Sequence, residues 1–325
     1  MKVNKTRNSI LLIITALIWG TAFVAQSKGG KAVGPYTFNC IRSLIGGMVL
    51  LPVIFILDKM KFNQADKSKL QDKGKPQDKN KTQDKRTLIT GGVLCGIMLF
   101  LASTMQQLGM YYGTTAGKAG FLTACYILIV PVLGMFFKKK CGVNIWIGVG
   151  ITLAGLYMLC MKGSFNLKFC DGLVMIGAFL FAIHIMVIDH FSPLTDGVRM
   201  SCIQFIVCGI LGLIPMFIID MEHSMKGINE WIPLMTTMEA WGTILYGGVL
   251  SCGVGYTLQI IGQKGLNPTI ASLLMSLESV FSVIAGCLIL GERMSAREIT
   301  GCILIFSAII MAQIPVGNRD RKVKG

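Results

Sequence analysis

Unbroken apolar runs of about twenty residues restrict the fold of this chain more than any other feature. One run extends from Ser9 to Gln26, and similar runs recur along the 325 residues. A helix needs about 20 apolar residues to cross a hydrocarbon core about 30 Å thick. Only helices and closed barrels satisfy their backbone groups within lipid, and a barrel would show segments of about ten residues with alternating polarity. The sequence therefore predicts an all-α, polytopic membrane protein.

Composition and charge exclude several other classes of protein. Charged residues make up 14% of the chain, against about 25% in soluble domains. The net charge of +15 comes from basic residues that flank the apolar runs, so we expect no nucleic-acid partner. The 11 cysteines form no C-x-x-C pair, and we expect them to serve as packing residues. Because the three histidines are dispersed along the chain, we expect no metal site and no other cofactor.

Ten segments are long and apolar enough to span a bilayer. They are Ser9–Gln26, Pro35–Leu57, Thr87–Met110, Ala116–Phe137, Asn144–Cys160, Cys170–Ile188, Gly197–Ile219, Ala240–Ile261, Asn267–Leu290 and Ser295–Ile314. With the N-terminus inside, the cytoplasmic segments carry 22 Lys and Arg residues and the outer loops carry 8. Positive charge gathers on the cytoplasmic side of membrane proteins. We therefore expect both termini to be cytoplasmic, in a bacterial-type plasma membrane.

The connection at 58–86 differs from the rest of the chain. It repeats Gln-Asp-Lys three times, starting at Gln71, and it has almost no apolar side chains. Such a segment cannot bury enough surface to fold, so we expect a disordered, basic cytoplasmic tether. It separates spans one and two, within 1–57, from spans three to five, within 87–169. The second half then covers 170–314, and 315–325 forms a cytoplasmic tail.

The two halves of the chain resemble each other. A shift of 153 residues overlays 104–109 on 257–262, where both read Thr-x-Gln-x-x-Gly. A shift of 162 residues pairs Cys40 with Cys202 and Gly47 with Gly209. Because five spans is an odd number, the second half must enter the membrane in the opposite orientation. Inverted repeats of this kind place a solute site near the midplane, between halves that move against each other.

Several motifs resemble a known family. They are Trp19-Gly20-x-x-Phe23 in the first span, TTAGKAGFLTACYILIVP at 114–131, and the closing segment at 276–311 with its Gly291-Glu292 turn. These resemble the EamA-type branch of the drug/metabolite transporter superfamily. The resemblance implies a ten-helix secondary transporter, in a family that often exports amino acids and small metabolites. One departure is Glu278-Ser279 where the family commonly has Glu-Pro, so no proline supports a helix break there.

Charged side chains within the spans are the first candidates for a site, because each is costly in hydrocarbon. Glu278 is the most central and would bind a cation, carry a coupling proton or balance a basic residue. Arg42 presents a planar guanidinium suited to a carboxylate or phosphate, although it can also extend to the interface. Lys118, at the outer end of span four, has the same two readings. Together Arg42 and Lys118 favour a substrate with an anionic group.

Uncharged polar and aromatic residues complete the predicted site. Gln106 and Gln259 occupy equivalent positions in the two halves and would orient polar groups of a substrate, or only join helices. Gln204 is the repeat partner of Arg42. His184 would relay protons or pack as a neutral residue. Trp19 would stack on an organic substrate or fill the core.

We therefore expect a secondary-active transporter of small organic metabolites, such as amino acids or related anion-bearing compounds, that exports them by alternating access. Ten helices can enclose their own pathway, so we expect a monomer. An integral-membrane transferase would need reactive groups clustered at an interface, and no loop supplies them, so we do not expect an enzyme. A non-transporting sensor or subunit would have only the tether for docking.

Overall fold

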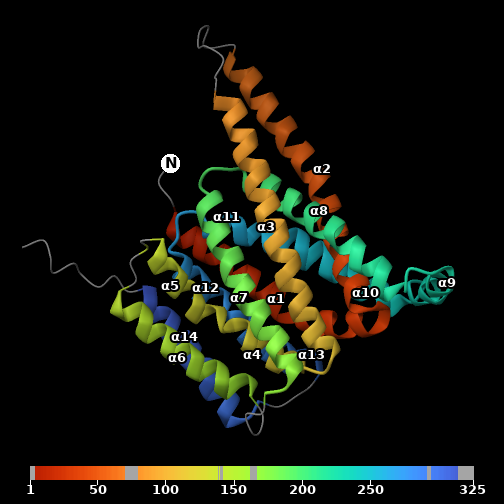
Figure 1. Cartoon of the computed structure of the whole chain (residues 1–325). Coiled ribbons are helices and arrows are strands. Elements are labelled where there is room, and N and C mark those ends of the chain that lie inside the picture. The colour runs from red at the N-terminus through yellow and green to blue at the C-terminus, as the bar shows by residue number, and fades with distance from the viewer. Residues whose placement is uncertain are drawn as a thin grey trace, which may run out of the picture.

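The computed structural model describes residues 4–69, 80–137, 139, 142–161, 167–290 and 294–313. In that part of the chain every regular element is a helix, and the helices form one bundle (Figure 1). They are α1 (Lys5–Val33), α2 (Pro35–Lys69), α3 (Asn80–Tyr111), α4 (Ala116–Ala124), α5 (Tyr126–Phe136), α6 (Val143–Cys160), α7 (Phe169–Phe191), α8 (Gly197–Pro215), η1 (Met216–Asp220), α9 (Met225–Leu234), α10 (Met238–Leu245), η2 (Tyr246–Tyr256), α11 (Thr257–Gln263), α12 (Pro268–Met275), α13 (Leu277–Leu290) and α14 (Ala296–Gln313).

Eight stretches among the described residues are long and apolar enough to cross a membrane. They correspond in order to the first eight predicted spans. The ninth span is formed by α12 and α13, and the tenth by α14. The predicted all-α, polytopic membrane fold is therefore confirmed.

The predicted tether at 58–86 is partly helical. The helix α2 continues to Lys69 and α3 begins at Asn80, and Figure 1 shows both extending beyond the neighbouring helices. Lys and Gln are good helix formers, and a helix that already exists propagates without a new nucleus. Residues 70–79, the predicted tail at 315–325 and the predicted Gly291-Glu292 turn lie outside the described residues.

The contact between α2 and α8 obeys the repeat symmetry. The Cys40 thiol donates to the carbonyl of Gly209 at 3.3 Å, and the Cys202 thiol donates to the carbonyl of Gly47 at 3.5 Å. Each residue of the first pair lies 162 positions from its equivalent in the second. Along this contact residue numbers rise on α2 while they fall on α8. The two equivalent helices are therefore antiparallel, as an inverted repeat requires.

Glycines mark the same symmetry between α6 and α14. A Cβ added to Gly155 would lie 2.8 Å from the carbonyl oxygen of Gly301, and one added to Gly148 would lie 3.2 Å from that of Ala308. The shift of 153 residues exchanges these two contacts. Here too the numbers run in opposite directions. Close approach of equivalent backbones leaves no room for a side chain at Gly155 or Gly301.

A third pair of contacts is related by the shift of 153 residues on one side and by the shift of 162 residues on the other. A Cβ on Gly109 would meet a methyl of Val174 at 2.4 Å, and one on Gly262 would meet Leu12 at 3.0 Å. The glycines differ by 153 positions and their partners by 162. The contacts between the two halves are therefore exchanged by the repeat, with equivalent helices in opposite orientations, and the predicted inverted repeat is confirmed.

Spans four and nine are both interrupted near their middle. The break between α4 and α5 lies at Cys125, and the break between α12 and α13 lies at Ser276. The ninth span thus breaks without the proline that the family commonly has. The Ser276 hydroxyl donates to the carbonyl of Leu273 at 2.7 Å, which satisfies one backbone group that the break would leave unpaired. Discontinuous helices of this kind typically border solute sites in carriers built from inverted repeats.

Candidate functional site

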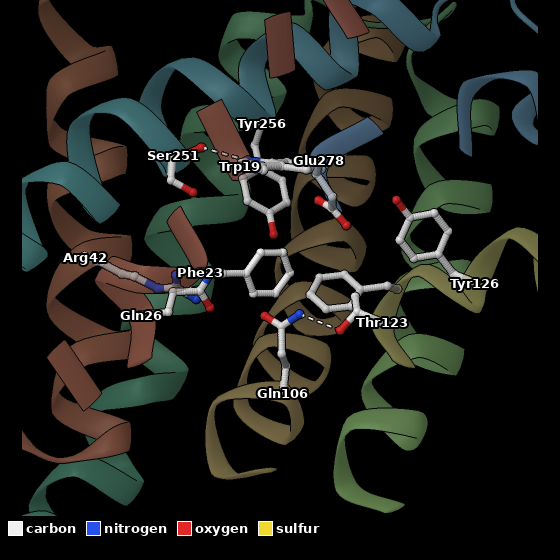
Figure 2. A pocket seen from close by; sticks show the side chains of 11 residues that line it. Trp19, Phe23, Gln26, Arg42, Gln106, Thr123, Tyr126, Ser251, Tyr256 and Glu278 are labelled. Carbon is white, nitrogen blue, oxygen red and sulfur yellow. Dashed lines mark hydrogen bonds between the residues drawn. The ribbon is translucent and has the colours of Figure 1, made fainter. Parts of the chain in front are cut away.

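A cavity lies between the two halves of the bundle, near the breaks in spans four and nine. Side chains from both repeats surround it, and Figure 2 shows them converging on a common space. The lining residues are Trp19, Phe23, Gln26, Arg42, Gln106, Thr123, Tyr126, Phe181, Ser251, Tyr256 and Glu278. The cavity has a volume of about 40 Å³, and one water needs about 10–15 Å³ of such space. It therefore has room for only a few waters.

Arg42, on α2, brings a positive charge to the cavity. Its side chain is buried, with 5% exposed. The Nε and Nη2 atoms donate to Asn39 Oδ1 at 3.0 and 2.6 Å, and the guanidinium lies 5.2 Å from the centre of the Phe38 ring. Asn39 in turn donates to Ser103 on α3 at 2.9 Å. No carboxylate forms an ion pair with Arg42 in the described part of the chain, so its charge is positioned but not neutralised.

Glu278, on α13 in the other half, brings a negative charge. Only 4% of the residue is exposed, and among the described residues its Oε1 atom has no hydrogen-bond partner. Figure 2 shows its carboxylate near the rings of Tyr256 and Tyr126. The Tyr126 hydroxyl is also buried without a hydrogen-bond partner there. Because the break at Ser276 lies two residues before Glu278, it starts α13 with this carboxyl group in its first turn.

Aromatic rings form one wall of the cavity. The rings of Trp19 and Tyr256 are 4.5 Å apart and tilted, and the indole Nε1 donates to the carbonyl of Ser251 at 3.4 Å. Ser251 and Tyr256 belong to the π-helix η2. π-Helical turns are rare and frequently occur at functional sites. This wall offers flat apolar surface beside a small number of polar groups.

An amide and a hydroxyl form the opposite side. Gln106 Nε2 donates to Thr123 Oγ1 at 2.8 Å, which joins α3 to α4 (Figure 2). The amide oxygen of Gln26, on α1, is buried and has no partner among the residues described. Gln106 can still accept a hydrogen bond and donate a second one. These groups can orient a polar solute in the cavity.

Lys118 does not line the cavity. It forms an ion pair with Asp171 at the start of α7, and the Asp171 side chain is almost fully buried. Asp171 also accepts hydrogen bonds from the Thr114 hydroxyl at 2.9 Å and from the backbone of Lys168 at 2.8 Å. In this conformation Lys118 therefore joins the two halves of the molecule.

His184 and Gln204 lie behind the cavity wall and contact each other. His184 Nε2 and Gln204 Oε1 are 3.2 Å apart, and both residues are fully buried. The imidazole ring lies 6.0 Å from the ring of Tyr256. Gln204 is the repeat partner of Arg42, but the two residues occupy different environments. His184 and Gln204 support the cavity wall without reaching the cavity.

Gln259 also lies outside the cavity, although its repeat partner Gln106 lines it. Gln259 is buried, and its Oε1 atom has no partner among the described residues. Thr123, the partner of Gln106, corresponds to Ser276 in the second half, and the Ser276 hydroxyl bonds to its own helix instead. Equivalent residues of the two repeats thus differ in their hydrogen-bond partners and in whether they line the cavity.

Of the eight residues predicted from the sequence, the structure places Trp19, Arg42, Gln106 and Glu278 around one cavity. The other lining residues, which are not among the eight predicted from the sequence, are Phe23, Gln26, Thr123, Tyr126, Phe181, Ser251 and Tyr256. Two signals identify some of them. Trp19, Phe23 and Gln26 follow helical spacing on one face, and the shift of 162 residues carries Trp19 onto Phe181.

The chemistry of the cavity favours binding. One unpaired cation and one unpaired carboxylate, with amides and aromatic rings between them, match a small organic molecule with groups of both signs. Across the described ranges, no group of three or more His, Cys, Asp or Glu residues is placed to hold a metal ion.

Comparison with known proteins agrees with this architecture. The model of the EamA-like transporter family matches the chain twice, at residues 7–161 and 168–313. An uncharacterized transporter of Archaeoglobus fulgidus is 25% identical over 94% of this chain and 85% of its own length. The uncharacterized transporter YoaV of Bacillus subtilis is 24% identical over 95% of this chain and 97% of its own length.

A solved structure supports the fold. A crystal structure described only as that of a protein matches with a TM-score of 0.68 at 15% identity, over 95% of this chain and 96% of its own. At that identity the likeness concerns the fold alone. The two family matches coincide with the two inverted halves that enclose the cavity. The chain therefore belongs to the EamA-like transporter family and is a multi-pass membrane transporter.

Proposed function

We propose that this protein is a secondary-active carrier of small organic metabolites that bear an anionic group, such as amino acids. The observation that carries the proposal is the pair Arg42 and Glu278. These opposite charges come from different halves of the molecule, line one cavity, and have no ion-pair partner among the described residues. Buried charge is costly in a membrane. Two buried charges without ion-pair partners therefore favour a solute that carries an anionic group for Arg42 and a cationic or donor group for Glu278.

The solute orientation follows from the positions of these groups. The anionic end of the solute binds Arg42, whose guanidinium is held by Asn39. A cationic or hydrogen-bond-donating end faces Glu278 and Tyr126. The aromatic wall of Trp19 and Tyr256 covers the organic body. Gln106 and Gln26 orient polar substituents.

Transport requires the cavity to widen. Its present volume of about 40 Å³ is too small for an amino acid, so this conformation is contracted. We propose that the two halves separate on one face to admit the solute, and on the other to release it. Inverted repeats permit such rocking around a fixed central site.

The direction and the driving force form the finer part of the proposal. The resemblance to exporters favours outward transport, and the distribution of Lys and Arg favours cytoplasmic termini. Glu278 would carry the coupling proton, because it is the acidic group that lines the cavity. The pathway lies within one chain, which supports a monomer, in a plasma membrane of bacterial type.

Binding to the purified protein tests this assignment. Cells with and without the protein are compared by metabolite profiling, and the metabolites that differ are added to protein in detergent. We expect an amphoteric compound to raise the melting temperature of the wild type. Arg42→Gln should lose binding of compounds with a carboxylate, whereas a matched compound with an amide in that place should bind both proteins alike. Equal binding of the carboxylate compound to wild type and Arg42→Gln would refute the proposed orientation.

Coupling needs a separate test. Flux of the identified solute is measured in proteoliposomes with and without a pH gradient. We expect the gradient to drive net flux in the wild type, while Glu278→Gln exchanges solute without responding to it. A wild type whose net flux ignores the gradient would exclude proton coupling and leave the binding assignment intact.

A further inference from the structure

A second, larger cavity lies at the surface of the bundle, between the C-terminal ends of α5 and α7. We call this cavity the groove. Its volume is about 780 Å³. From α7 it is lined by Ile183, Val187 and His190, which recur every three or four residues and so share one face of the helix. Phe181, which lines the central cavity, lies on the opposite side of α7 at helical spacing. The two cavities are therefore separate.

The groove changes from apolar to polar along its length. Leu133 and Ile183 lie within the segments that cross the membrane, whereas Lys139 and His190 lie at or just beyond the ends of those segments, Phe136 and Phe191. From Ile183 to His190 the groove follows α7 for about 10 Å at about 1.5 Å per residue. Its floor is thus at the depth of acyl chains, and its mouth is at the level of lipid head groups.

An ammonium group and an imidazole, from Lys139 and His190, line the mouth of the groove. Lys139 Nζ lies 2.8 Å from Asp189 Oδ2, and the lysine side chain is 44% exposed while the aspartate is 8% exposed. The carboxylate is therefore mostly covered, although it lines the groove as well, and it holds the ammonium at the surface of the groove. Because an ammonium has three donors, Lys139 can bind an additional acceptor. The exposed imidazole of His190 lies beside the carboxylate in the sequence and lines the same groove.

We propose that this groove is a binding site for one glycerophospholipid. Its phosphate binds at Lys139 and His190, and an acyl chain lies along Leu133, Ile183 and Met186. A water-soluble metabolite does not fit, because the floor is apolar and at membrane depth. The site joins α5 of the first half to α7 of the second, so the bound lipid bridges the two repeats. Binding of this lipid does not depend on which solute the protein transports.

Native mass spectrometry of the full chain in detergent tests the site. Dioleoyl-phosphatidylglycerol is the probe, and dioleoylglycerol has the same chains without the phosphate. We expect one retained phospholipid on the wild type and at least tenfold weaker retention of dioleoylglycerol. Ile183→Trp fills the floor and should abolish retention. Ile176→Trp is the matched control, because Ile176 lies two turns earlier on the same face, is 52% exposed and does not line the groove.

Lys139→Gln gives a second test that leaves the floor unchanged. It should weaken retention of the phospholipid at least fivefold and leave that of dioleoylglycerol unaltered. Each variant is compared at equal folded fraction, measured by its elution profile and melting temperature. Retention by Ile183→Trp equal to that of Ile176→Trp would overturn the proposal, as would equal retention of the two lipids by the wild type. Neither result would affect the proposed central site, since no flux is measured.

Discussion

Single polar groups that lack partners define the central site. In the core of a membrane protein an unpaired hydroxyl, amide or carboxylate costs free energy unless something else binds it. Glu278 Oε1, Tyr126 Oη and Gln26 Oε1 are such atoms among the described residues, and all three residues line the same cavity. Their coincidence is stronger support for a binding site than any one of them would be.

Charge within an apolar run is conspicuous in a sequence, and this signal predicts Arg42 and Glu278. Lys118 satisfied the same criterion, but a carboxylate from the other repeat, Asp171, neutralises it. Pairing between distant segments is invisible in a single sequence. Tyr126 and Phe181 were missed because an aromatic residue in an apolar run is ordinarily a core residue.

Removal of an unpaired hydroxyl should affect binding rather than stability. Tyr126→Phe deletes a hydroxyl with no partner in the described chain, so we expect an unchanged melting temperature and weaker solute binding. Tyr246→Phe is the matched control, because its hydroxyl donates to the carbonyl of Ile18 at 3.0 Å. That variant should lose about 0.5–1.5 kcal/mol of stability. A larger loss of stability in Tyr126→Phe than in Tyr246→Phe would contradict this assignment.

Gly20 sets the distance between α1 and the helix that carries Glu278. A Cβ at Gly20 would lie 2.6 Å from the carbonyl oxygen of Glu278 and 2.9 Å from Phe281 Cβ. Backbone atoms cannot move aside, so Gly20→Ala must displace α13. We expect a loss of about 1–3 kcal/mol together with weaker solute binding.

Gly150→Ala is the control for Gly20→Ala, since nothing lies within 4 Å of an added Cβ at Gly150. It should leave the melting temperature and the affinity close to those of the wild type. If the two alanine variants behaved alike in thermal unfolding and solute titration, close packing at Gly20 would not position Glu278.

Neighbouring helices are held together by different interactions, by close packing in one pair and by ion pairs in another. The helix α1 packs against α13 through Gly20. Spans four and six instead have an ion pair at each end, Lys118 with Asp171 and Lys139 with Asp189. Both ion pairs join the first half of the molecule to the second. They are formed together in this conformation, so separation of the halves would break at least one of them.

The two ion pairs should contribute unequally to stability. Asp171 is almost fully buried and accepts from Lys118, Thr114 and the backbone of Lys168, so its replacement removes a buried charge together with these three interactions. Breaking a buried pair costs about 3–5 kcal/mol, whereas an exposed pair contributes about 0–1 kcal/mol. We expect Asp171→Asn to lower the melting temperature more than Asp189→Asn, whose partner Lys139 is more exposed. Equal or reversed effects in thermal unfolding would contradict this ranking.

The spans themselves were predictable, because their signal is length and hydropathy. Three local features were not. The helical flanks of the tether contain few apolar residues, so hydropathy gives no signal there. The break at Ser276 has no proline, and α9 (Met225–Leu234) lies in what the sequence marks only as a long connection. Each of these depends on packing or propensity rather than on the span pattern.

In the whole molecule, the helix contacts between the two halves obey the repeat symmetry, whereas the lining of the central cavity does not. The contacts of α2 with α8 and of α6 with α14 are exchanged by the repeat, but Gln106 lines the cavity while its partner Gln259 does not. In a carrier built from inverted repeats, the opposite-facing state exchanges the conformations of the halves. Gln259 would then border the site, and Gln106 would be buried.

This exchange predicts a role for a residue outside the present cavity. Gln259→Ala should lower solute flux per folded protein at least severalfold. Gln263→Ala is the matched control, because Gln263 is one turn away, equally buried and without partners among the described residues, while its repeat equivalent is the apolar Met110. Flux of Gln259→Ala indistinguishable from that of Gln263→Ala in proteoliposomes would contradict the exchange.

We propose that the two opposed halves carry a solute through a site formed by Arg42 and Glu278. Counterflow in proteoliposomes measures this most directly, since labelled solute outside exchanges with unlabelled solute inside through the same site. We predict counterflow that saturates with solute concentration, is lost in Arg42→Gln, and returns the solute chemically unchanged. Flux that rises linearly without saturation, persists in Arg42→Gln, or converts the solute into another compound would contradict the account.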